Sequence, residues 1–191
     1  MPPPEITAFL DKWHDFFLLA GTAAVTLVGL LFVALSMNLD VLIHESKSHL
    51  LQHARSTLLS FTYVLFLSLI ALVPLQGLRM IAMNLVMLSA ISLGTHLYGA
   101  WRARRDLTSE EERFLRRRGR TLIVGYLAGA AIGVALITTR DPDDLYGVVG
   151  LTCLILGNAA GSSWDLLVRV GKLKAAQART EAERLVDAER R

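Results

Sequence analysis

Long apolar runs alternate with short polar segments along the whole chain, and this pattern predicts membrane-spanning helices. A helix needs about 20 mostly apolar residues to cross about 30 Å of hydrocarbon. Five runs are that long and carry no Asp, Glu, Lys or Arg in their middle: residues 16–37, 56–74, 80–100, 121–139 and 145–165. The pattern therefore predicts an all-α fold, a polytopic membrane bundle of five transmembrane helices.

Two of the polar connections are expected to be helical as well. The 38–55 segment and the second run before Pro74 contain no Gly or Pro, which predicts one long helix through both. In the 101–120 segment, Thr108 and Glu111 have the spacing of a capping box, which predicts a short helix. We assign residues 1–165, these two segments included, to a transmembrane domain.

The last segment, residues 166–191, has no proline and predicts a C-terminal amphipathic helix that continues the fifth span. Its apolar stripe at 3–4 spacing consists of Val168, Ala175, Ala178, Ala182 and Leu185. This spacing is typical of a short coiled-coil seam. A tail lying on the membrane surface, or on loops of the same protein, is the alternative.

The basic residues are strongly segregated along the chain. With five spans, the 38–55, 101–120 and C-terminal segments lie on one side of the membrane and together hold 17 of the 20 Lys and Arg residues. Because cytoplasmic segments carry the excess of Lys and Arg, we expect the N-terminus outside and the C-terminus inside. The basic pI of 9.3 then reflects topology and gives no reason to expect a nucleic-acid partner.

Composition agrees with a membrane location. Hydrophobic residues make up 53% of the chain and the mean hydropathy is +0.44, which is too apolar for an ordinary soluble domain. The single cysteine, Cys153, lies inside an apolar run. One cysteine excludes a disulfide within the chain and a metal cluster built on several cysteines.

Two runs carry glycines on one helical face. Gly125, Gly129 and Gly133 are four residues apart in the fourth run, and Gly157 and Gly161 repeat this spacing in the fifth. Small residues let helix backbones approach closely in lipid. These stripes predict helix packing, either within the chain or between subunits.

A polar stripe extends from the 38–55 segment into the second run at 3–4 spacing: Glu45, His49, Gln52, Ser56, Ser60 and Tyr63. In a ring of subunits such a stripe would line an aqueous pore, since lipid would reject it. Alternatively, the helix is simply solvated and its serines bond to their own backbone.

The remaining candidate chemistry is limited. Glu45, His49 and His53 have i, i+4 spacing that suits a metal ion, but they lack the HExxH order and a fourth ligand, so we predict no metal site. The sequence contains no nucleophile–base constellation and no phosphate loop. We therefore predict no enzyme and no cofactor.

An arginine cluster in the 101–120 segment is a candidate contact for anionic lipid or an acidic partner: Arg113, Arg116, Arg117 and Arg118. Its alternative role is only to fix the orientation of the chain in the membrane.

Residues 13–40, WHDFFLLAGTAAVTLVGLLFVALSMNLD, resemble the first span of small uncharacterised bacterial integral-membrane proteins. The features that carry this resemblance are an aromatic-rich entry, a Gly/Ala/Thr stretch and an ending like LLFVALSMN. The resemblance implies a bacterial cytoplasmic (inner) membrane location. It transfers no functional residue.

Two functions are expected from these patterns. The first is a homo-oligomeric ion channel or pore in contact with membrane lipids. The alternative is a non-conducting membrane scaffold or regulatory subunit that binds a partner or anionic lipid through its basic cytosolic face. The sequence names no protein partner.

Overall fold

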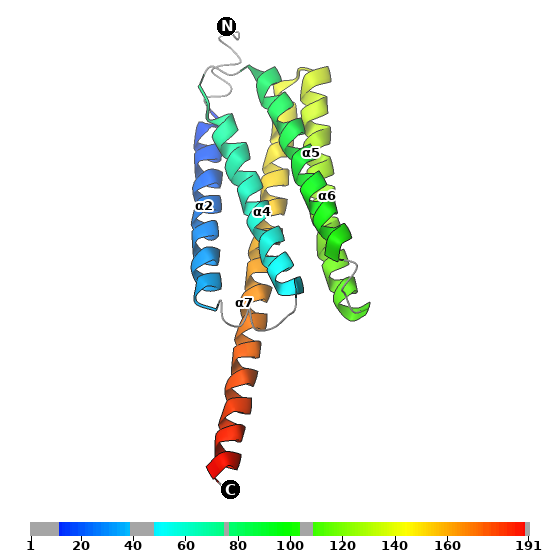
Figure 1. Cartoon of the computed structure of the whole chain (residues 1–191). Helices are drawn as coiled ribbons and strands as arrows, with labels where there is room; N and C mark the ends of the chain where they lie inside the picture. Colours follow the sequence, from blue (N-terminus) through cyan, green and yellow to red (C-terminus); the bar gives the residue numbers. More distant parts are fainter. Residues whose placement is uncertain (1–11, 39–47, 75–76, 104–108, 190–191) are drawn as a thin grey trace.

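The computed structural model describes residues 12–38, 48–74, 77–103 and 109–189. For residues 48–52, 102–103, 109–118 and several residues of the tail it describes the backbone alone. The described residues form helices and connecting turns and no strand. In chain order the helices are α2 (His14–Ser36), α4 (Ser48–Ala71), α5 (Leu78–Ala103), α6 (Ser109–Thr138), the short 3-10 helix η1 (Pro142–Leu145) and α7 (Tyr146–Glu189) (Figure 1).

The five predicted spans are confirmed. The helices that are long and apolar enough to cross a membrane cover His14–Ser36, His53–Ala71, Leu78–Trp101, Gly119–Thr138 and, with the start of the tail, Pro142–Thr180. Only 22–44% of the most apolar window in each is buried inside the chain, so most of this apolar surface is left for lipid or for another protein. The chain is thus an all-α integral membrane protein with five candidate spans.

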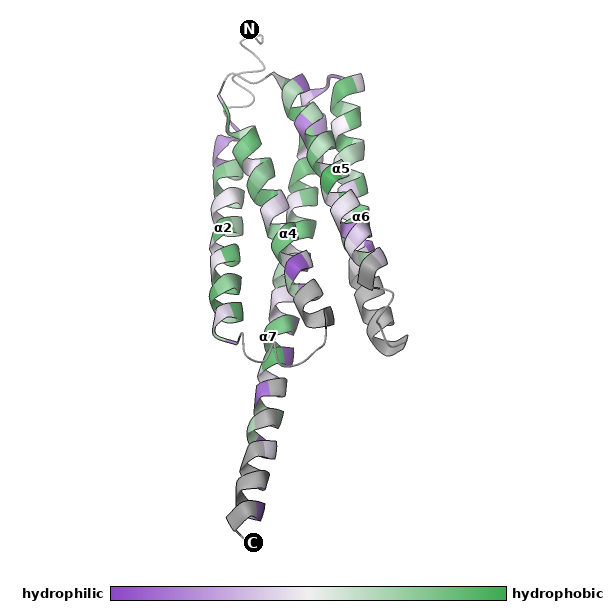
Figure 2. Ribbon diagram, in the orientation of Figure 1, coloured by the Kyte–Doolittle hydropathy of each residue, from purple (hydrophilic) through white to green (hydrophobic). Residues whose placement is uncertain are grey.

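Successive helices run in opposite directions. As a result the start of α4, the end of α5, the start of α6 and the tail of α7 lie at the same end of the bundle, the lower end in Figure 1. Figure 2 shows that hydrophilic residues gather toward the ends of the helices, while the lengths between are mostly apolar. The described parts of the three segments that carry most of the basic charge therefore belong to one end. Which side of a membrane that end faces stays a prediction.

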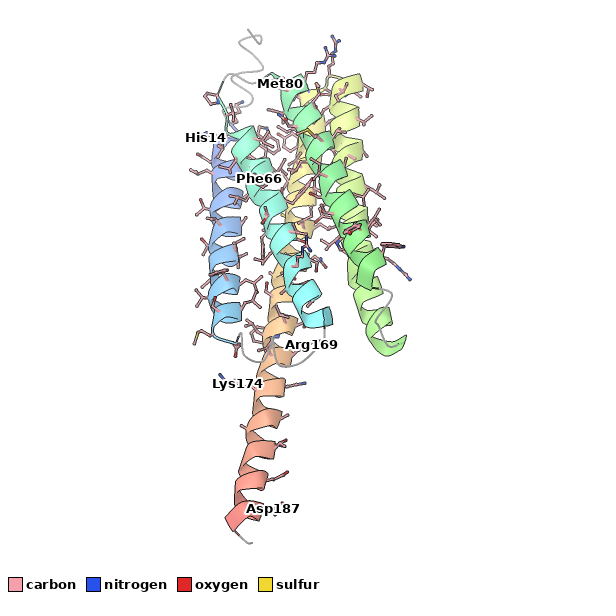
Figure 3. The ribbon with its side chains drawn as sticks, viewed as in Figure 1. His14, Phe66, Met80, Arg169, Lys174 and Asp187 are labelled. Atoms are coloured by element: carbon pink, nitrogen blue, oxygen red, sulfur yellow. The ribbon has the colours of Figure 1, made fainter. Side chains whose placement is uncertain are left out.

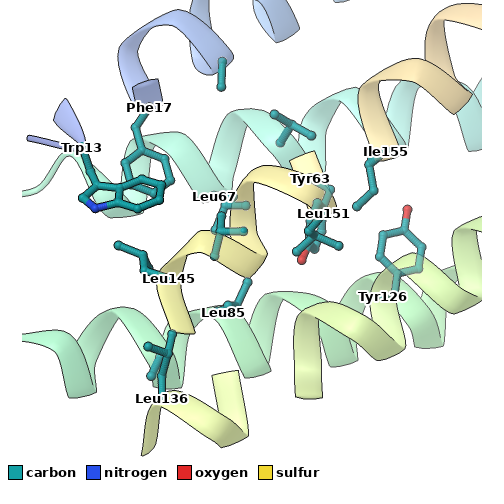
Figure 4. Close-up of a cluster of buried hydrophobic side chains, with 14 of the residues drawn as sticks. Trp13, Phe17, Tyr63, Leu67, Leu85, Tyr126, Leu136, Leu145, Leu151 and Ile155 are labelled. Atoms are coloured by element: carbon teal, nitrogen blue, oxygen red, sulfur yellow. The ribbon is translucent and has the colours of Figure 1, made fainter. Parts of the chain in front are cut away.

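Helix α4 lies at the centre of the bundle, because it packs against α2, α5 and α7. The α5–α6 pair has the most extensive contact, and α6 also packs against α7. The main core joins all of these helices, and its larger members are Trp13, Phe17, Tyr63, Leu67, Leu85, Tyr126, Leu136, Leu145, Leu151 and Ile155 (Figure 4).

The turn between α6 and α7 is stabilised by several hydrogen bonds of its own. The carboxylate of Asp141 accepts from the backbone N–H of Asp143 at 3.0 Å, and the hydroxyl of Thr139 donates to Asp144 at 2.6 Å. Arg140 has a φ of 56°, a left-handed conformation that costs a non-glycine residue about 1–2 kcal/mol. The hydrogen bonds of this turn offset that strain and fix the direction in which α7 enters the bundle.

Aromatic side chains tie the start of α2 to the start of α7. The rings of Trp13 and Tyr146 are 5.0 Å apart in an edge-to-face arrangement. Aromatic pairs of this geometry contribute about 0.5–1.5 kcal/mol beyond their area burial. Both α6, through its turn, and α2, through this pair, therefore position α7, and with it the side of α7 that points away from the bundle.

Helix α7 continues far beyond the other helices (Figure 1). Among its described side chains, Val170 is the last that is buried, and those from Gly171 to Asp187 are exposed. The absence of proline predicted that the fifth span would continue into the tail, and the single helix Tyr146–Glu189 confirms it. The helix passes residue 165 without a break, and the predicted division into two domains at that point stays a prediction.

The other two predicted helical segments also join their spans. α6 begins at Ser109, so the helix expected in the 101–120 segment is the first part of the fourth span helix, while its predicted cap Thr108 lies outside the described residues. α4 begins at Ser48, and residues 39–47 of the predicted long helix lie outside the described residues.

Candidate functional site

The polar stripe predicted on the second span points into the bundle of the single chain. Ser56 is half-buried, Ser60 is fully buried, and only 1% of the Tyr63 surface is exposed. Figure 4 shows Tyr63 among core side chains, beside Leu151 of α7. In one chain, these three side chains therefore lie against other helices of the same bundle.

Tyr63 on α4 and Ser89 on α5 form a hydrogen bond between their hydroxyl groups, with the oxygens 2.9 Å apart. Both side chains are buried, so the bond joins two helices inside the membrane part of the protein. Gly129 on α6 makes room for it. A Cβ atom at residue 129 would lie 2.6 Å from the Ser89 oxygen and 2.7 Å from the Tyr63 oxygen. The hydroxyl pair therefore requires glycine at this position.

A second tyrosine extends this contact toward the end of the bundle at which the tail of α7 leaves it. The ring of Tyr126 on α6 is centred 5.2 Å from that of Tyr63, and its hydroxyl hydrogen bonds with Ser60 on α4. His96 on α5 lies 6.3 Å from the Tyr126 ring and hydrogen bonds with the backbone of Gly119. We call Ser60, Tyr63, Ser89, His96 and Tyr126 the hydroxyl–histidine network, and it connects α4, α5 and α6.

Serine and threonine hydroxyls of α4 also bond to their own helix. Ser56 and Thr57 both donate to the carbonyl of His53 at 2.9 Å, and Ser60 donates to the carbonyl of Ser56 at 3.0 Å. This backbone bonding was the alternative to a pore for the stripe. These bonds satisfy the hydroxyls within α4 itself, without water and without a second subunit.

Other candidates of the stripe lie outside what the structure describes. This applies to Glu45 and to the side chains of His49 and Gln52. His53 is described, and it is buried on α4 with 7% of its surface exposed. In the described parts of the chain, no group of three His, Cys, Asp or Glu residues could hold a metal ion. A pore mouth at Glu45, and the weak metal candidate, stay predictions.

The glycine stripe of α6 serves packing within the chain. Gly125 lies against Leu154 and Ile155 of α7, where an added Cβ would be 3.2 Å and 3.4 Å from their side chains. At Gly133 an added Cβ would lie 2.6 Å from the Val86 side chain and 3.0 Å from the carbonyl oxygen of Ala82 on α5. With Gly129, these glycines let α6 approach both α5 and α7.

The glycines of α7 are placed differently. Gly157 has no atom within 4 Å of an added Cβ, and Gly161 is half-buried. No other helix of the chain therefore packs closely against Gly157. Packing between subunits remains the alternative for this position.

Exposed basic residues gather at the inner end of the bundle in the predicted orientation. They are Arg55 on α4, Arg120 on α6, and Arg169, Lys172 and Lys174 on α7; Figure 3 labels Arg169 and Lys174. The backbone that carries Arg113, Arg116, Arg117 and Arg118 belongs to the first turns of α6, and their side chains lie outside the description.

The opposite end has a different charge. It carries exposed Arg79 and Arg140, with Asp141 and Asp143 exposed in the turn beside Arg140. The four named side chains at this end therefore have no net charge, whereas those named at the other end are all basic, and only the basic end suits contact with anionic headgroups.

Sequence reasoning missed two partners of the network, Ser89 and Tyr126. A signal for them exists in the sequence: Ser89 and Gly129 are small residues near the middle of neighbouring spans, where a tyrosine hydroxyl needs both space and a partner. It also missed that the outward face of α7 is lined by small residues, because only the packing of the other helices shows which face points outward.

Comparison with known proteins adds no assignment. No protein-family model matches the chain, and searches of curated proteins and of solved structures give no match.

Proposed function

We propose that this protein is a non-conducting membrane scaffold or regulatory subunit, which holds a basic surface and a projecting helix at the inner face of a membrane. The observation that carries the proposal is the internal use of the polar stripe. Tyr63 bonds to Ser89, and Ser60 bonds to Tyr126 and to its own helix. Hydroxyls with partners inside the chain are not available to line a pore between subunits. The proposal needs no cofactor and no catalytic residue.

The inner end of the bundle supports the same proposal. Its exposed side chains include Arg55 near the start of α4, Arg120 in the first half of α6, and Lys172 and Lys174 at the start of the tail of α7. Basic residues next to a membrane surface gain about 1 kcal/mol each from anionic lipids. Orientation with the C-terminus inside rests on the asymmetry of Lys and Arg, and the bacterial inner membrane rests on the resemblance of residues 13–40.

The competing proposal is an ion channel formed by several subunits and lined by Glu45, His49 and Gln52. Ion flux into liposomes containing the purified protein separates the two. A scaffold gives no flux above that of protein-free liposomes, with or without Glu45→Lys. Flux that changes with Glu45→Lys would support the channel and contradict the scaffold.

Lipid contact is tested with spin-labelled lipids in membranes of mixed composition. We expect the protein to enrich labelled phosphatidylglycerol over phosphatidylcholine at its surface, and high salt to reduce this enrichment, because surface charge is screened. Replacing Arg116, Arg117 and Arg118 by Gln should lower the enrichment.

The matched control is the double substitution of Arg79 and Arg140 by Gln at the opposite end of the bundle. It should leave the enrichment unchanged if the inner end binds the lipid. Equal effects of the two sets of substitutions would contradict a lipid-binding inner face.

A further inference from the structure

The side of α7 that points away from the bundle is lined mainly by small residues, with Trp164 and Val168 between them. On this side of the span, Gly150, Cys153, Gly157, Ala160 and Trp164 are exposed, and the exposed Leu154 and Leu167 border them, whereas Leu151, Ile155 and Ala159 are buried against other helices. The pattern continues in the tail with the exposed residues Val168, Gly171, Ala175 and Ala178. We call these nine residues the α7 seam.

The seam keeps one direction from the membrane into the tail. With about 100° between successive residues, all nine positions lie within an arc of about 100°. In sequence, Ala182 and Leu185 extend the same arc. A straight helix therefore presents one continuous narrow face, along which a second helix can run.

The glycines of the seam have no function within the chain that the packing explains. An added Cβ at Gly150, Gly157 or Gly171 would meet no atom within 4 Å. Glycine in a helix interior costs about 1 kcal/mol relative to alanine in water. Gly29 and Gly94 are open as well, but only α7 carries three open glycines at multiples of seven residues on one face, which would let a helix from outside the chain approach closely.

We propose that the α7 seam binds the α7 seam of a second copy of this chain, giving a parallel dimer. The inference rests on the proposed function, since it names the first partner of the projecting helix. A second copy is favoured because its α7 has the same length and carries small residues at the same positions, both in the span and in the tail. A partner that matches only the tail would leave Gly150 and Gly157 uncovered.

The size of the contact is sufficient for a stable dimer. Residues 150–185 of a helix span about 54 Å, and a helix is about 10 Å wide, so two copies would bury about 1,100 Å² in total. Specific interfaces begin at about 1,000–1,200 Å². The exposed indole of Trp164, in the middle of the seam, adds a large apolar side chain of the kind enriched at interfaces.

One charge contact opposes the dimer. Lys174 and Arg179 flank the two edges of the seam, so a parallel dimer brings Lys174 of one copy near Arg179 of the other. Like charges at such exposed positions destabilise by a few tenths of a kcal/mol. This is small beside an interface of that length. It also predicts that salt strengthens the dimer, whereas salt weakens lipid binding.

Cys153 lies in the seam and is the only cysteine of the chain, so it reports the dimer directly. Oxidation with copper phenanthroline in native membranes should convert the 21.0 kDa chain into a reductant-sensitive species of twice that mass. In a Cys153→Ala background, Gly157→Cys should restore the cross-link. Gly29→Cys, at an equally open position on α2, should not.

The second arm measures association itself. Gly157→Leu should reduce dimerisation at least about tenfold, while Gly29→Leu leaves it unchanged. Both positions are open, so both variants should fold, and their unfolding in detergent verifies this. Cross-linking of Cys153 no stronger than that of a cysteine at residue 29, or a dimer unaffected by Gly157→Leu, would overturn the inference. Lipid enrichment and the absence of ion flux would then still stand, because neither measurement depends on the seam.

Discussion

Helices α6 and α7 both carry regularly spaced glycines, but those of α6 lie against neighbouring helices and those of α7 lie on an open face. A Cβ atom added at Gly129 or Gly133 would lie within 3 Å of a neighbouring side chain, whereas one added at Gly150 or Gly157 would have no atom within 4 Å. The α6 glycines are thus explained by contacts within one chain. Gly150 and Gly157 have no such contact within the chain, and the proposed dimer would supply one. A glycine stripe alone therefore predicts close packing, and the fold decides with which partner.

We expect the largest difference in the free energy of unfolding between Gly133→Ala and Gly157→Ala. Gly133→Ala places a methyl group 2.6 Å from Val86 and 3.0 Å from the backbone oxygen of Ala82, and a backbone atom cannot move aside easily. Overpacking of this kind costs about 1–3 kcal/mol, and we expect the upper end. Gly157→Ala should change the free energy of unfolding by less than about 1 kcal/mol. Reversible unfolding in mixed micelles measures both, and equal losses would contradict the comparison.

Gly129→Ala should follow, with a loss of about 1–3 kcal/mol toward the lower end, because it displaces hydroxyl groups and no backbone atom. Combination with Tyr63→Phe provides a sharper test. The Tyr63 hydroxyl is held on a rigid ring 2.7 Å from the added Cβ, so its removal should relieve part of the strain. The double variant should therefore be more stable than the sum of the single changes predicts. Strict additivity would show that the hydroxyl pair is not what requires glycine at residue 129.

Tyr63→Phe alone should have a smaller effect, a loss of about 0.6 kcal/mol. This is the average for a hydrogen bond between helices in a membrane protein. Ser89→Ala should give a similar loss, and the double variant little more, since both remove the same bond. Tyr98→Phe, on the exposed side of α5, is the control and should leave the unfolding free energy unchanged. A loss at Tyr98 as large as at Tyr63 would argue against the network.

The sequence predicted the helices well and their contacts poorly, for a physical reason. Span length and hydropathy are properties of one segment, so all five spans and the continuation of α7 could be read from it. Which face of a span is buried depends on the neighbouring helices, and in lipid both faces are apolar. The stripe through Ser60 and Tyr63 was correctly seen as polar. However, its partners Ser89 and Tyr126 lie on other helices, at positions that the sequence alone does not align.

Ser56→Ala is expected to have the smallest effect on the free energy of unfolding. It tests whether the polar stripe, like the α6 glycines, serves contacts within the chain. The Ser56 hydroxyl donates to the carbonyl of His53 on its own helix, at 2.9 Å, so its loss leaves the contacts between helices intact. We expect the free energy of unfolding to change by no more than about 0.5 kcal/mol. Ion flux should be absent in both forms. If Ser56→Ala instead altered a measurable flux while stability stayed the same, then the stripe would reach an aqueous path, and its burial within one chain would not describe the working assembly.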